Sequence, residues 1–488
     1  MVVNSLNFLL FFVVVFIVYY LPLCRDNARI RNGWLFLSSY WFYGVTDWKM
    51  IPLLLGATIV FYVLGLWLKS EMVKSNAKKA SRLTTLGVCL GVGILLYFKY
   101  LNFFAVQFAD LLSSIGLNVT WTTLNIILPV GVSFFTFKLI SYVIEIHREH
   151  IDPCEDFVEF GTYIAFFPTI LSGPIDRPNS LISQLKGNKD FDHNLAIDGF
   201  RQILWGMFTK MCIADNLAVA TDTIWSSYME QSGSTLFITA LLYFIQMYAD
   251  FDGYSNMAIG IGKILGIKIT RNFNHPLLAR NTAEYWRRWH MSLTSWITDY
   301  IFMPLNIAFR NYGNLGICMA CMINLVIIGL WHGANWTYGL FGLYHGLLFI
   351  PLVYSGAFGK NKKLKTGFSK LPKFNDFLKM GGTFILVSIG LIIFRAQSVA
   401  DVFAYMSKVF SKSILSVPSV LLGKASLLLI TVLLLLEWYQ RDKEHPLLMK
   451  SSFIENKKWL PFILDYVVIA AIILFGNSEG NQFIYFQF

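Results

Sequence analysis

Two histidines, His290 and His332, are the residues of this sequence that are best placed to do chemistry. His332 directly follows the uncharged apolar run 323–330. A titratable imidazole at membrane depth is costly, so it marks a candidate functional site. Histidine is also the usual general base near neutral pH, where it contributes roughly 100- to 10,000-fold to a reaction rate. The alternative is structural: an imidazole that hydrogen-bonds a helix carbonyl and holds two helices together.

The sequence around His332 combines small, aromatic and amide residues: Gly329, Trp331, Gly333, Ala334, Asn335 and Trp336. Small residues next to a histidine either make room for a substrate or let another backbone approach. We expect the two tryptophans to wall the site. The Asn335 amide is placed to orient the imidazole or to bind an acyl carbonyl.

Residues 281–300 predict one amphipathic helix around the second histidine. Its apolar face recurs at three- and four-residue steps, at Trp286, Trp289, Leu293, Trp296 and Ile297. Asn281, followed three residues later by Glu284, resembles a capping box. We expect this helix at the cytoplasmic interface, with His290 at the edge of its apolar face.

Four charged residues are further candidates for substrate binding or proton transfer. Arg287 and Arg288 on the predicted helix either bind an anionic donor or anchor the helix beside the lipid headgroups. Asp250 and Asp252 fall inside the apolar segment 235–262, where a carboxylate needs a partner, a proton or a cavity. We expect them to pair with Lys or Arg and keep Asp250 as a substrate-binding candidate. A proton relay is the alternative.

The composition places these residues in a polytopic membrane protein. Of 488 residues, 56% are hydrophobic and 14% are charged, and the mean hydropathy is +0.55. A soluble chain carries about 25% charged residues. The net charge of +11 lies in loops between apolar segments, which argues against nucleic acid. The CxxC formed by Cys318 and Cys321 is itself apolar and has no second pair, so core packing is favoured over zinc.

Twelve apolar segments are candidate membrane spans: 6–23, 34–45, 50–68, 84–105, 124–144, 200–220, 235–262, 315–331, 335–356, 380–395, 425–438 and 460–475. The alternate loops, beginning with 24–33, hold 31 of the 40 Lys and Arg residues, against four in the other loops. By the positive-inside rule the basic loops are cytoplasmic and both termini are extracytoplasmic. Segment 157–172 predicts a re-entrant or half-buried piece.

Several motifs together resemble the membrane-bound O-acyltransferase (MBOAT) family, and within it the bacterial alginate O-acetylase branch. The motifs are Leu-Pro-Val-Gly-Val-Ser-Phe-Phe-Thr-Phe at 128–137, Gly-Pro-Ile at 173–175, Ile-Ala-Asp-Asn-Leu-Ala at 213–218, Asp-Phe-Asp-Gly-Tyr-Ser-Asn-Met-Ala-Ile-Gly at 250–260, Asn-Phe-Asn-His-Pro at 272–276, Glu-Tyr-Trp-Arg-Arg-Trp-His at 284–290 and Trp-His-Gly-Ala-Asn-Trp at 331–336. The resemblance covers about 124–350. Asp252 departs from it, since a small residue is expected there.

The resemblance implies an all-α polytopic fold, with a ring of about 11–12 transmembrane helices and re-entrant or interfacial helices around a central funnel. It implies one membrane domain over 1–488. His332 matches the family's catalytic histidine, and His290 matches the second histidine near the donor path. In this reading His332 deprotonates an attacking hydroxyl, and Asn335 or backbone N–H groups near Gly333 stabilise the oxyanion.

The predicted function is O-acylation of a cell-envelope polysaccharide by a multi-pass protein of the bacterial cytoplasmic membrane. Acetyl-CoA in the cytoplasm is the expected donor substrate, and we expect no bound cofactor or metal ion. One alternative is transfer of D-alanine from a carrier protein toward teichoic acid. A second, from another class, is a transporter or flippase with Asp250 and Asp252 as its coupling site. That alternative predicts internal repeats, and the sequence contains none.

The C-terminal residues 483–488 read Phe-Ile-Tyr-Phe-Gln-Phe and follow a polar link at 476–481. An aromatic anchor at the membrane interface is one interpretation. The segment also resembles the FxYxxF ending of envelope-acylating members of the family, where the tyrosine is implied to carry the acyl group. We therefore expect Tyr485 to accept the acyl group. An SGNH-type, esterase-like partner at the extracytoplasmic face would complete delivery, since the outer loop 396–424 has no nucleophile motif.

Overall fold

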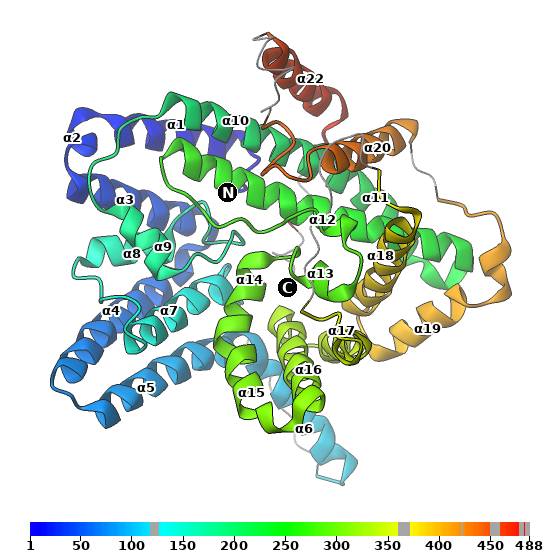
Figure 1. Cartoon of the computed structure of the whole chain (residues 1–488), viewed down its shortest axis with the longest axis horizontal. Coiled ribbons are helices and arrows are strands. Elements are labelled where there is room, and N and C mark those ends of the chain that lie inside the picture. Colours follow the sequence, from blue (N-terminus) through cyan, green and yellow to red (C-terminus); the bar gives the residue numbers. More distant parts are fainter. Residues whose placement is uncertain (118–125, 360–370, 421–422, 449–458, 478–482, 484–488) are drawn as a thin grey trace. The chain divides into compact units, whose positions relative to one another are not determined.

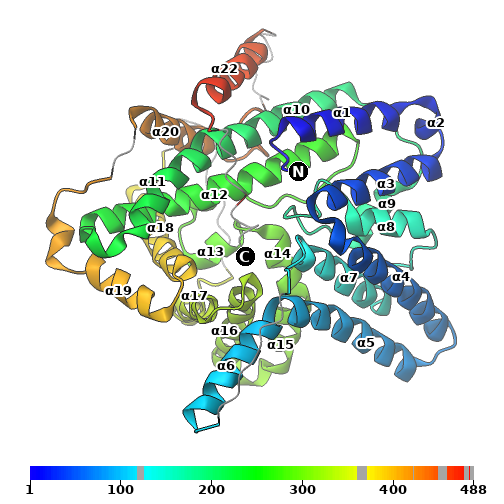
Figure 2. The same cartoon turned by 180° about the vertical axis from the view of Figure 1, so that it is seen from behind.

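The computed structural model describes residues 1–117, 126–359, 371–420, 423–448, 459–477 and 483. The chain forms two compact units, Met1–Phe200 with Ala258–Thr270 and Arg201–Met257 with Arg271–Phe488. All regular secondary structure in the described ranges is helical, as Figures 1 and 2 show from two sides. This confirms the all-α prediction. The single domain over 1–488 and the ring around a funnel stay predictions.

The predicted apolar segments are confirmed as helices. Each of the twelve falls mostly within a helix, apart from residues 124–125, which lie outside the described residues. Within the described chain, seven helical stretches are long and apolar enough to cross a membrane: Ala28–Val73, Ala77–Ser114, His193–Ser226, Gly233–Ile264, Arg310–His332, Trp336–Tyr354 and Phe374–Arg395. Two apolar helices in the described chain, α1 (Leu6–Tyr20) and α22 (Leu460–Phe475), are shorter. The protein is therefore a multi-pass membrane protein.

The first unit contains the N-terminal helices. They are α1 (Leu6–Tyr20), α2 (Pro22–Arg25), α3 (Ala28–Asp47), α4 (Ile51–Val73), α5 (Ala77–Leu95), a π-helical stretch (Leu96–Tyr100), α6 (Leu101–Ser114), α7 (Val132–His147), α8 (Phe157–Ala165), α9 (Pro178–Leu185) and the start of α10 (His193–Met207). In Figures 1 and 2, α3 and α8 lie side by side.

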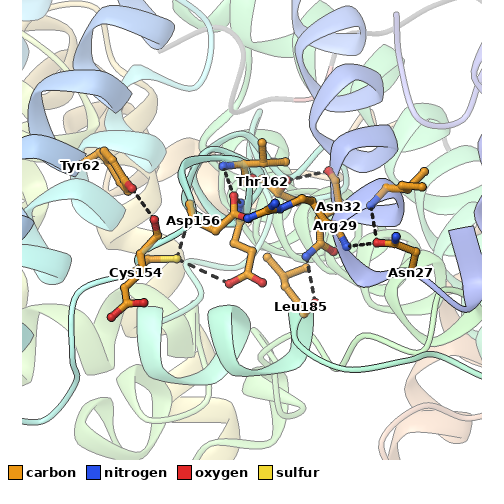
Figure 3. Close-up of polar contacts among 12 residues, drawn as sticks. Asn27, Arg29, Asn32, Tyr62, Cys154, Asp156, Thr162 and Leu185 are labelled. Carbon is orange, nitrogen blue, oxygen red and sulfur yellow. Dashed lines mark hydrogen bonds and ion pairs between the residues drawn. The ribbon is translucent and has the colours of Figure 1, made fainter.

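A polar cluster joins α3, α8 and α9 of this unit (Figure 3). Asp156 caps α8 by accepting a hydrogen bond from the Val158 amide at 2.7 Å. The Asn32 side chain on α3 donates to the Leu185 carbonyl of α9 at 3.0 Å, and the hydroxyl of Thr162 donates to the Asn32 carbonyl at 3.2 Å. The bonds to the Val158 amide and to the Leu185 carbonyl satisfy backbone groups that the start of α8 and the end of α9 leave unpaired.

The segment predicted to be re-entrant is α8 followed by a run of turns, and the backbone at 166–176 is buried in protein. Lys138 on α7 donates to the Tyr163 carbonyl and to the Thr169 hydroxyl, both at 3.1 Å. Asp176 accepts from the backbone amide and the hydroxyl of Thr270 at 2.9 and 2.7 Å. The Phe167 amide donates to the Ser39 hydroxyl at 3.2 Å, and the Tyr163 hydroxyl donates to the Asp176 carbonyl at 3.4 Å. Irregular backbone within a membrane protein is tolerated where protein groups surround it and satisfy it in this way.

The second unit carries both candidate histidines. Its elements are the end of α10, a π-helical stretch (Phe208–Ala214), α11 (Asp215–Ser226), most of α12 (Gly233–Ile264), α13 (Thr282–Trp286), α14 (Met291–Ile297), a second π-helical stretch (Thr298–Phe302), α15 (Met303–Ala308), α16 (Gly313–His332), α17 (Trp336–Tyr354), α18 (Phe374–Arg395), α19 (Val399–Val409), α20 (Lys424–Tyr439) and α22 (Leu460–Phe475). Helices α16 and α17 pack side by side along much of their length.

Two glycines set how closely α10 and α12 approach each other. A Cβ atom on Gly206 would lie 2.5 Å from the carbonyl oxygen of Gly253, and one on Gly253 would lie 2.8 Å from the carbonyl oxygen of Gly206. Small residues at such a crossing let helix backbones meet in a membrane protein. The crossing brings Lys210 of the π-helical stretch against Asp250 of α12.

The predicted single amphipathic helix over 281–300 is wrong. The chain forms α13, leaves helical geometry at 287–290 and resumes as α14. The cap is confirmed, since the Asn281 side chain accepts from the Glu284 amide at 2.8 Å. The Glu284 carboxylate, however, accepts from the amide of Arg280 and not from that of Asn281. All five tryptophan, leucine and isoleucine side chains of the expected apolar face are buried in protein, so the segment is an interior element.

Candidate functional site

The break between α13 and α14 centres on His290. Its backbone is left-handed, with φ 42° and ψ 54°, a conformation that is uncommon outside glycine. The conformation is held from outside the segment, because the Met291 amide donates to the Asn272 carbonyl at 2.7 Å. The imidazole is buried and lies edge-on to the Phe251 ring, with 4.7 Å between ring centroids.

The side chain of Asn272 fixes the tautomer of His290. Its amide nitrogen donates to the Ser255 hydroxyl at 3.1 Å, which orients the amide. Its oxygen accepts from the Ser292 hydroxyl at 2.8 Å and lies 2.9 Å from Nδ1 of His290. Because that oxygen is an acceptor, Nδ1 carries the proton and Nε2 carries the lone pair.

The charge state of His290 follows from its burial. Desolvation of the imidazolium lowers the pKa of His290 to about 3. The ring is therefore neutral at pH 7. A neutral imidazole whose Nδ1–H is held by a fixed acceptor has the arrangement of a general base or of a hydrogen-bond acceptor for substrate.

His332 ends α16, and its ring lies in an aromatic enclosure. The Trp331 ring is 4.9 Å away and the Phe394 ring 5.0 Å away between centroids. Trp331 also meets His290, at 6.0 Å. The structure therefore brings the two candidate histidines into contact with one indole, although they are 42 residues apart in the sequence.

The glycines near His332 allow the backbone of α17 to pack closely against α16. A Cβ on Gly329 would overlap the carbonyl of Tyr338, and one on Gly333 would overlap the Tyr338 ring. The first turn of α17 thus packs directly on the last turn of α16. Of the two roles that the sequence left open, these glycines have the packing role.

Asn335 and Trp336 stand at the junction of α16 and α17. The Asn335 side-chain oxygen caps α17 by accepting from the Thr337 amide at 3.0 Å, and its nitrogen donates to the Gln397 carbonyl at 2.7 Å. Trp336 is 56% exposed and Trp331 is buried, so the two indoles have different environments. The substrate-binding roles of all three residues stay predictions.

Arg288 belongs to a buried ion cluster. Its Nη2 lies 2.8 Å from Oε1 of Glu284, and Nε of Arg280 lies 3.0 Å from Oε2 of the same carboxylate. Burial raises the pKa of Glu284, but the hydrogen bonds and charges of the two arginines outweigh burial and hold it below its usual value. Arg288 also donates to the Asn274 carbonyl at 3.0 Å. These contacts fasten α13 to the loop that carries Asn272.

Arg287 borders a cavity of about 210 Å³. The cavity is lined by Ala283, Trp286, Arg287, Thr294, Thr298, Phe302, Cys321, Asn324, Leu325, Ile328, Phe349 and Phe358. The guanidinium donates from Nη1 to the Phe358 carbonyl at 3.0 Å, while Nε and Nη2 meet no hydrogen-bond acceptor in the part of the chain that the structure describes. An arginine so placed can receive an anionic group.

Asp250 is paired with a lysine, as expected. Nζ of Lys210 lies 2.5 Å from Oδ1 of Asp250 and 2.8 Å from Oδ1 of Asp215, and all three side chains are buried. Asp252 accepts from the side-chain amide of Asn256 at 2.8 Å, and it makes no ion pair with a Lys or Arg in the part of the chain that the structure describes, so the expected pairing holds for Asp250 and not for Asp252. Tyr485 lies outside the described residues, whereas Phe483 is described and buried.

Sequence reasoning missed Asn272, Phe394 and Lys210. Asn272 opens the motif at 272–276 that carries the family resemblance, so a signal for it was present. Lys210 could have been found as the nearest cation within an apolar segment for Asp250. Phe394 is one of many apolar residues in α18 and carried no signal.

Comparison with known proteins identifies the family of the chain. Residues 82–363 match the model of MBOAT, the membrane-bound O-acyltransferase family. A probable alginate O-acetylase of Pseudomonas aeruginosa is 34% identical over 416 residues, which are 84% of this chain and 75% of that protein. A peptidoglycan O-acetyltransferase of Helicobacter pylori is 31% identical over 407 residues, covering 76% and 72%. A teichoic acid D-alanyltransferase of Bacillus subtilis is 31% identical over 291 residues, covering 56% and 70%. The chain belongs to the membrane-bound O-acyltransferase family and is an O-acyltransferase.

Proposed function

We propose that this protein moves an acetyl group from a cytoplasmic thioester to hydroxyls of a polysaccharide outside the membrane, and that the reaction takes place at His290, Trp331 and His332. The observation that carries the proposal is the meeting of both imidazoles at the Trp331 ring. Relatives named as alginate O-acetylases and as a peptidoglycan O-acetyltransferase support the acetyl group and the polysaccharide acceptor.

In the proposed reaction His332 is the general base and Tyr485 is the first acceptor. His332 takes the proton of the Tyr485 hydroxyl as the oxygen attacks the thioester carbonyl. A C–O bond forms, the C–S bond breaks, and the imidazolium returns the proton to the leaving thiolate. The step consumes no oxidant or further reactant.

A tyrosine ester suits a relay because phenol is a good leaving group. The phenolic pKa is near 10, well below that of a sugar hydroxyl, so the ester keeps much of the transfer potential of the thioester. A separate SGNH-type transferase at the outer face would then pass the acetyl group to the polymer. The lack of a nucleophile motif in the outer loop 396–424 supports such a partner.

His290 has a supporting role in this scheme. Its neutral ring, held through Nδ1 by Asn272, presents the Nε2 lone pair in a fixed direction. That arrangement fits the orientation of the donor or of a proton in transit. If substitution of His290 abolishes the reaction as completely as substitution of His332, the two histidines act as one unit.

Acetyl-CoA is the proposed donor substrate, and the Arg287 cavity is a proposed contact for an anionic part of it. The charge distribution of the loops supports a protein of the bacterial cytoplasmic membrane with both termini outside. Entry of the donor from the cytoplasm and departure of the acyl group on the outer side follow from that orientation.

Transfer of D-alanine is the second candidate, because two teichoic acid D-alanyltransferases are each 31% identical to this chain. Its donor would be a carrier protein, and its acceptor a teichoic acid. These relatives match 60% and 56% of the chain, less than the alginate O-acetylases do.

The test supplies reconstituted protein with labelled acetyl-CoA or with a D-alanyl carrier protein, and reads the acylated residue by mass spectrometry. We expect acetyl on Tyr485 with acetyl-CoA, and none in His332→Ala. His193→Ala is the matched control, since that histidine is exposed. Labelling from the carrier protein alone would select the second candidate, and labelling from neither donor would contradict both.

A further inference from the structure

Phe483, the residue of the C-terminal segment that the structure describes, is buried in the protein. The Phe483 side chain is 1% exposed. Its ring centroid lies 4.4 Å from Nζ of Lys210, and the Tyr254 ring meets it edge-on at 4.9 Å and 88°. A phenyl ring this close to an ammonium group is attracted through its negative face, and the attraction grows when both are desolvated.

Lys210 is built into a charged group that is costly to bury. Its ammonium bridges Asp215 and Asp250, and the exposed fractions of the three side chains are 1%, 5% and 5%. With both carboxylates ionised, the group holds one positive and two negative charges. Buried ions of this kind seldom add stability over apolar residues of the same volume.

The chain at the end of α22 is held by the same π-helical stretch and by the first turn of α11. The Asn477 amide donates to the Met211 carbonyl at 3.0 Å, and the Asn216 side chain donates to the Phe475 carbonyl at 2.8 Å. Met211 is the immediate neighbour of Lys210. The chain is therefore attached to this stretch both where it leaves α22 and at Phe483. π-helical turns inside α-helices are frequent at functional sites, because the extra residue re-aims a side chain.

Fixing Phe483 restricts Tyr485 through covalent geometry alone. Two residues of extended chain span at most about 7 Å. The Cα atom of Tyr485 therefore stays within that distance of the Cα atom of Phe483, whatever path the chain takes. Holding a reactive group in a small volume is a recognised source of rate enhancement.

We propose that Lys210, Asp215, Asp250 and Tyr254 form a docking seat for the aromatic side chain of Phe483, and that this seat positions Tyr485 for acyl transfer. The proposal rests on the proposed role of Tyr485 as acyl acceptor. It gives Lys210 and Asp250 positioning roles, and it makes the C-terminal segment an internal ligand of the second unit.

The seat is tested in the full-length, reconstituted protein with Phe483→Ala and Phe483→Leu. Leucine keeps apolar volume and removes the π face, so it separates the cation–ring attraction from burial. We expect acylation of Tyr485 to slow at least tenfold in the alanine variant and to an intermediate degree in the leucine variant. The KM for acetyl-CoA should not change. Phe475→Ala is the matched control, since Phe475 is 43% exposed at the end of α22.

Adding the tail as a separate peptide tests the positioning role directly, because a residue that only stabilises the fold would not be replaced by a free peptide. A peptide of residues 477–488 is added to the Phe483→Ala protein, whose seat is vacant. We expect the peptide to become acetylated, and a peptide with the same Phe483→Ala change to stay unlabelled. Lys210→Met should abolish rescue in a chain that is folded by size-exclusion chromatography.

Two outcomes separate this proposal from the proposed function. An unchanged acylation rate in Phe483→Ala, with Tyr485→Phe inactive, would overturn the seat and leave the tyrosine relay standing. Full polymer acetylation by Tyr485→Phe would overturn the relay. In that case protease cleavage of the tail still tests docking: faster cleavage in Phe483→Ala than in wild type supports the seat, and equal cleavage rejects it.

Discussion

The Nδ1–H group of His290 donates to the side-chain oxygen of Asn272, 2.9 Å away. The two residues are 18 positions apart and lie on either side of α13. Asn272 is in turn held by Ser255 and Ser292, so the acceptor has little freedom to turn. The pair fixes which nitrogen of a buried, neutral imidazole faces the rest of the site.

Asn272→Ala should reduce acyl transfer without removing His290. A buried donor left without its acceptor costs about 1–3 kcal/mol, which corresponds to roughly five- to 150-fold in rate if the cost falls on the transition state. The measurement is the initial rate of acetyl transfer at saturating donor. Ser292→Ala is the control, because it removes another donor to Asn272 and leaves the histidine bond. Equal losses in the two variants would assign Asn272 a purely structural role.

His332→Ala should lower acyl transfer at least 100-fold while the protein stays folded, because it removes the proposed base. His290→Ala should retain measurable activity. Both are assayed by incorporation of labelled acetyl into polymer, with folding checked by thermal unfolding in detergent. Normal polymer acetylation in His332→Ala would remove that residue from the mechanism.

Acid should destabilise the protein through His290. Burial lowers the pKa of His290 to about 3, whereas an unfolded chain has a histidine pKa near 6.5. The unfolded state therefore binds a proton between these values and the folded state does not. The stability that this difference contributes is full above pH 6.5 and is lost progressively as the pH falls toward 3. In His290→Gln the fall in unfolding temperature over that range should be shallower than in wild type. An identical slope would mean that other groups account for it.

Gly333→Ala should destabilise the junction of α16 and α17. The new methyl group would overlap the Tyr338 ring, and overpacking of this kind costs typically about 1–3 kcal/mol. Gly339→Ala is the matched control, because its Cβ would meet only Leu330 at 3.5 Å, an ordinary contact. Thermal unfolding and acetyl transfer should both fall in the first variant and stay near wild type in the second. Equal behaviour would show that Tyr338 moves aside freely.

Substitution of Arg287 should affect donor binding, whereas substitution of the neighbouring Arg288 should affect stability. Arg287→Gln should raise the KM for acetyl-CoA, since its guanidinium faces a cavity with unused donors. Arg288→Gln should lower the unfolding temperature, since it breaks the buried contact with Glu284. Steady-state kinetics and thermal unfolding on both variants check this. A KM that is unchanged in Arg287→Gln would exclude the cavity as a donor contact.

Local patterns in the sequence were enough for the class of protein and for the helices. Burial of long apolar runs in a membrane leaves the helix as the stable choice, so the twelve segments were predictable from hydropathy alone. The pairing of Asp250 with a cation followed from the cost of an isolated carboxylate in the same way. His332 at the end of α16 was visible because an apolar run ends there.

Contacts between residues that are distant in the sequence could be seen only in the tertiary structure, and some of them change the predicted elements. Periodicity made 281–300 a continuous helix, but Asn272 captures the Met291 amide and the His290 ring and breaks it. The sequence pattern predicted that Glu284 completes a capping box, but its carboxylate instead binds Arg280 and Arg288 inside the protein. The contact of His290 and His332 with one indole, and that of Phe483 with Lys210, likewise depend on how helices pack. Sequence periodicity predicts which face of an element is apolar. It does not predict which group from a distant part of the chain packs against that face.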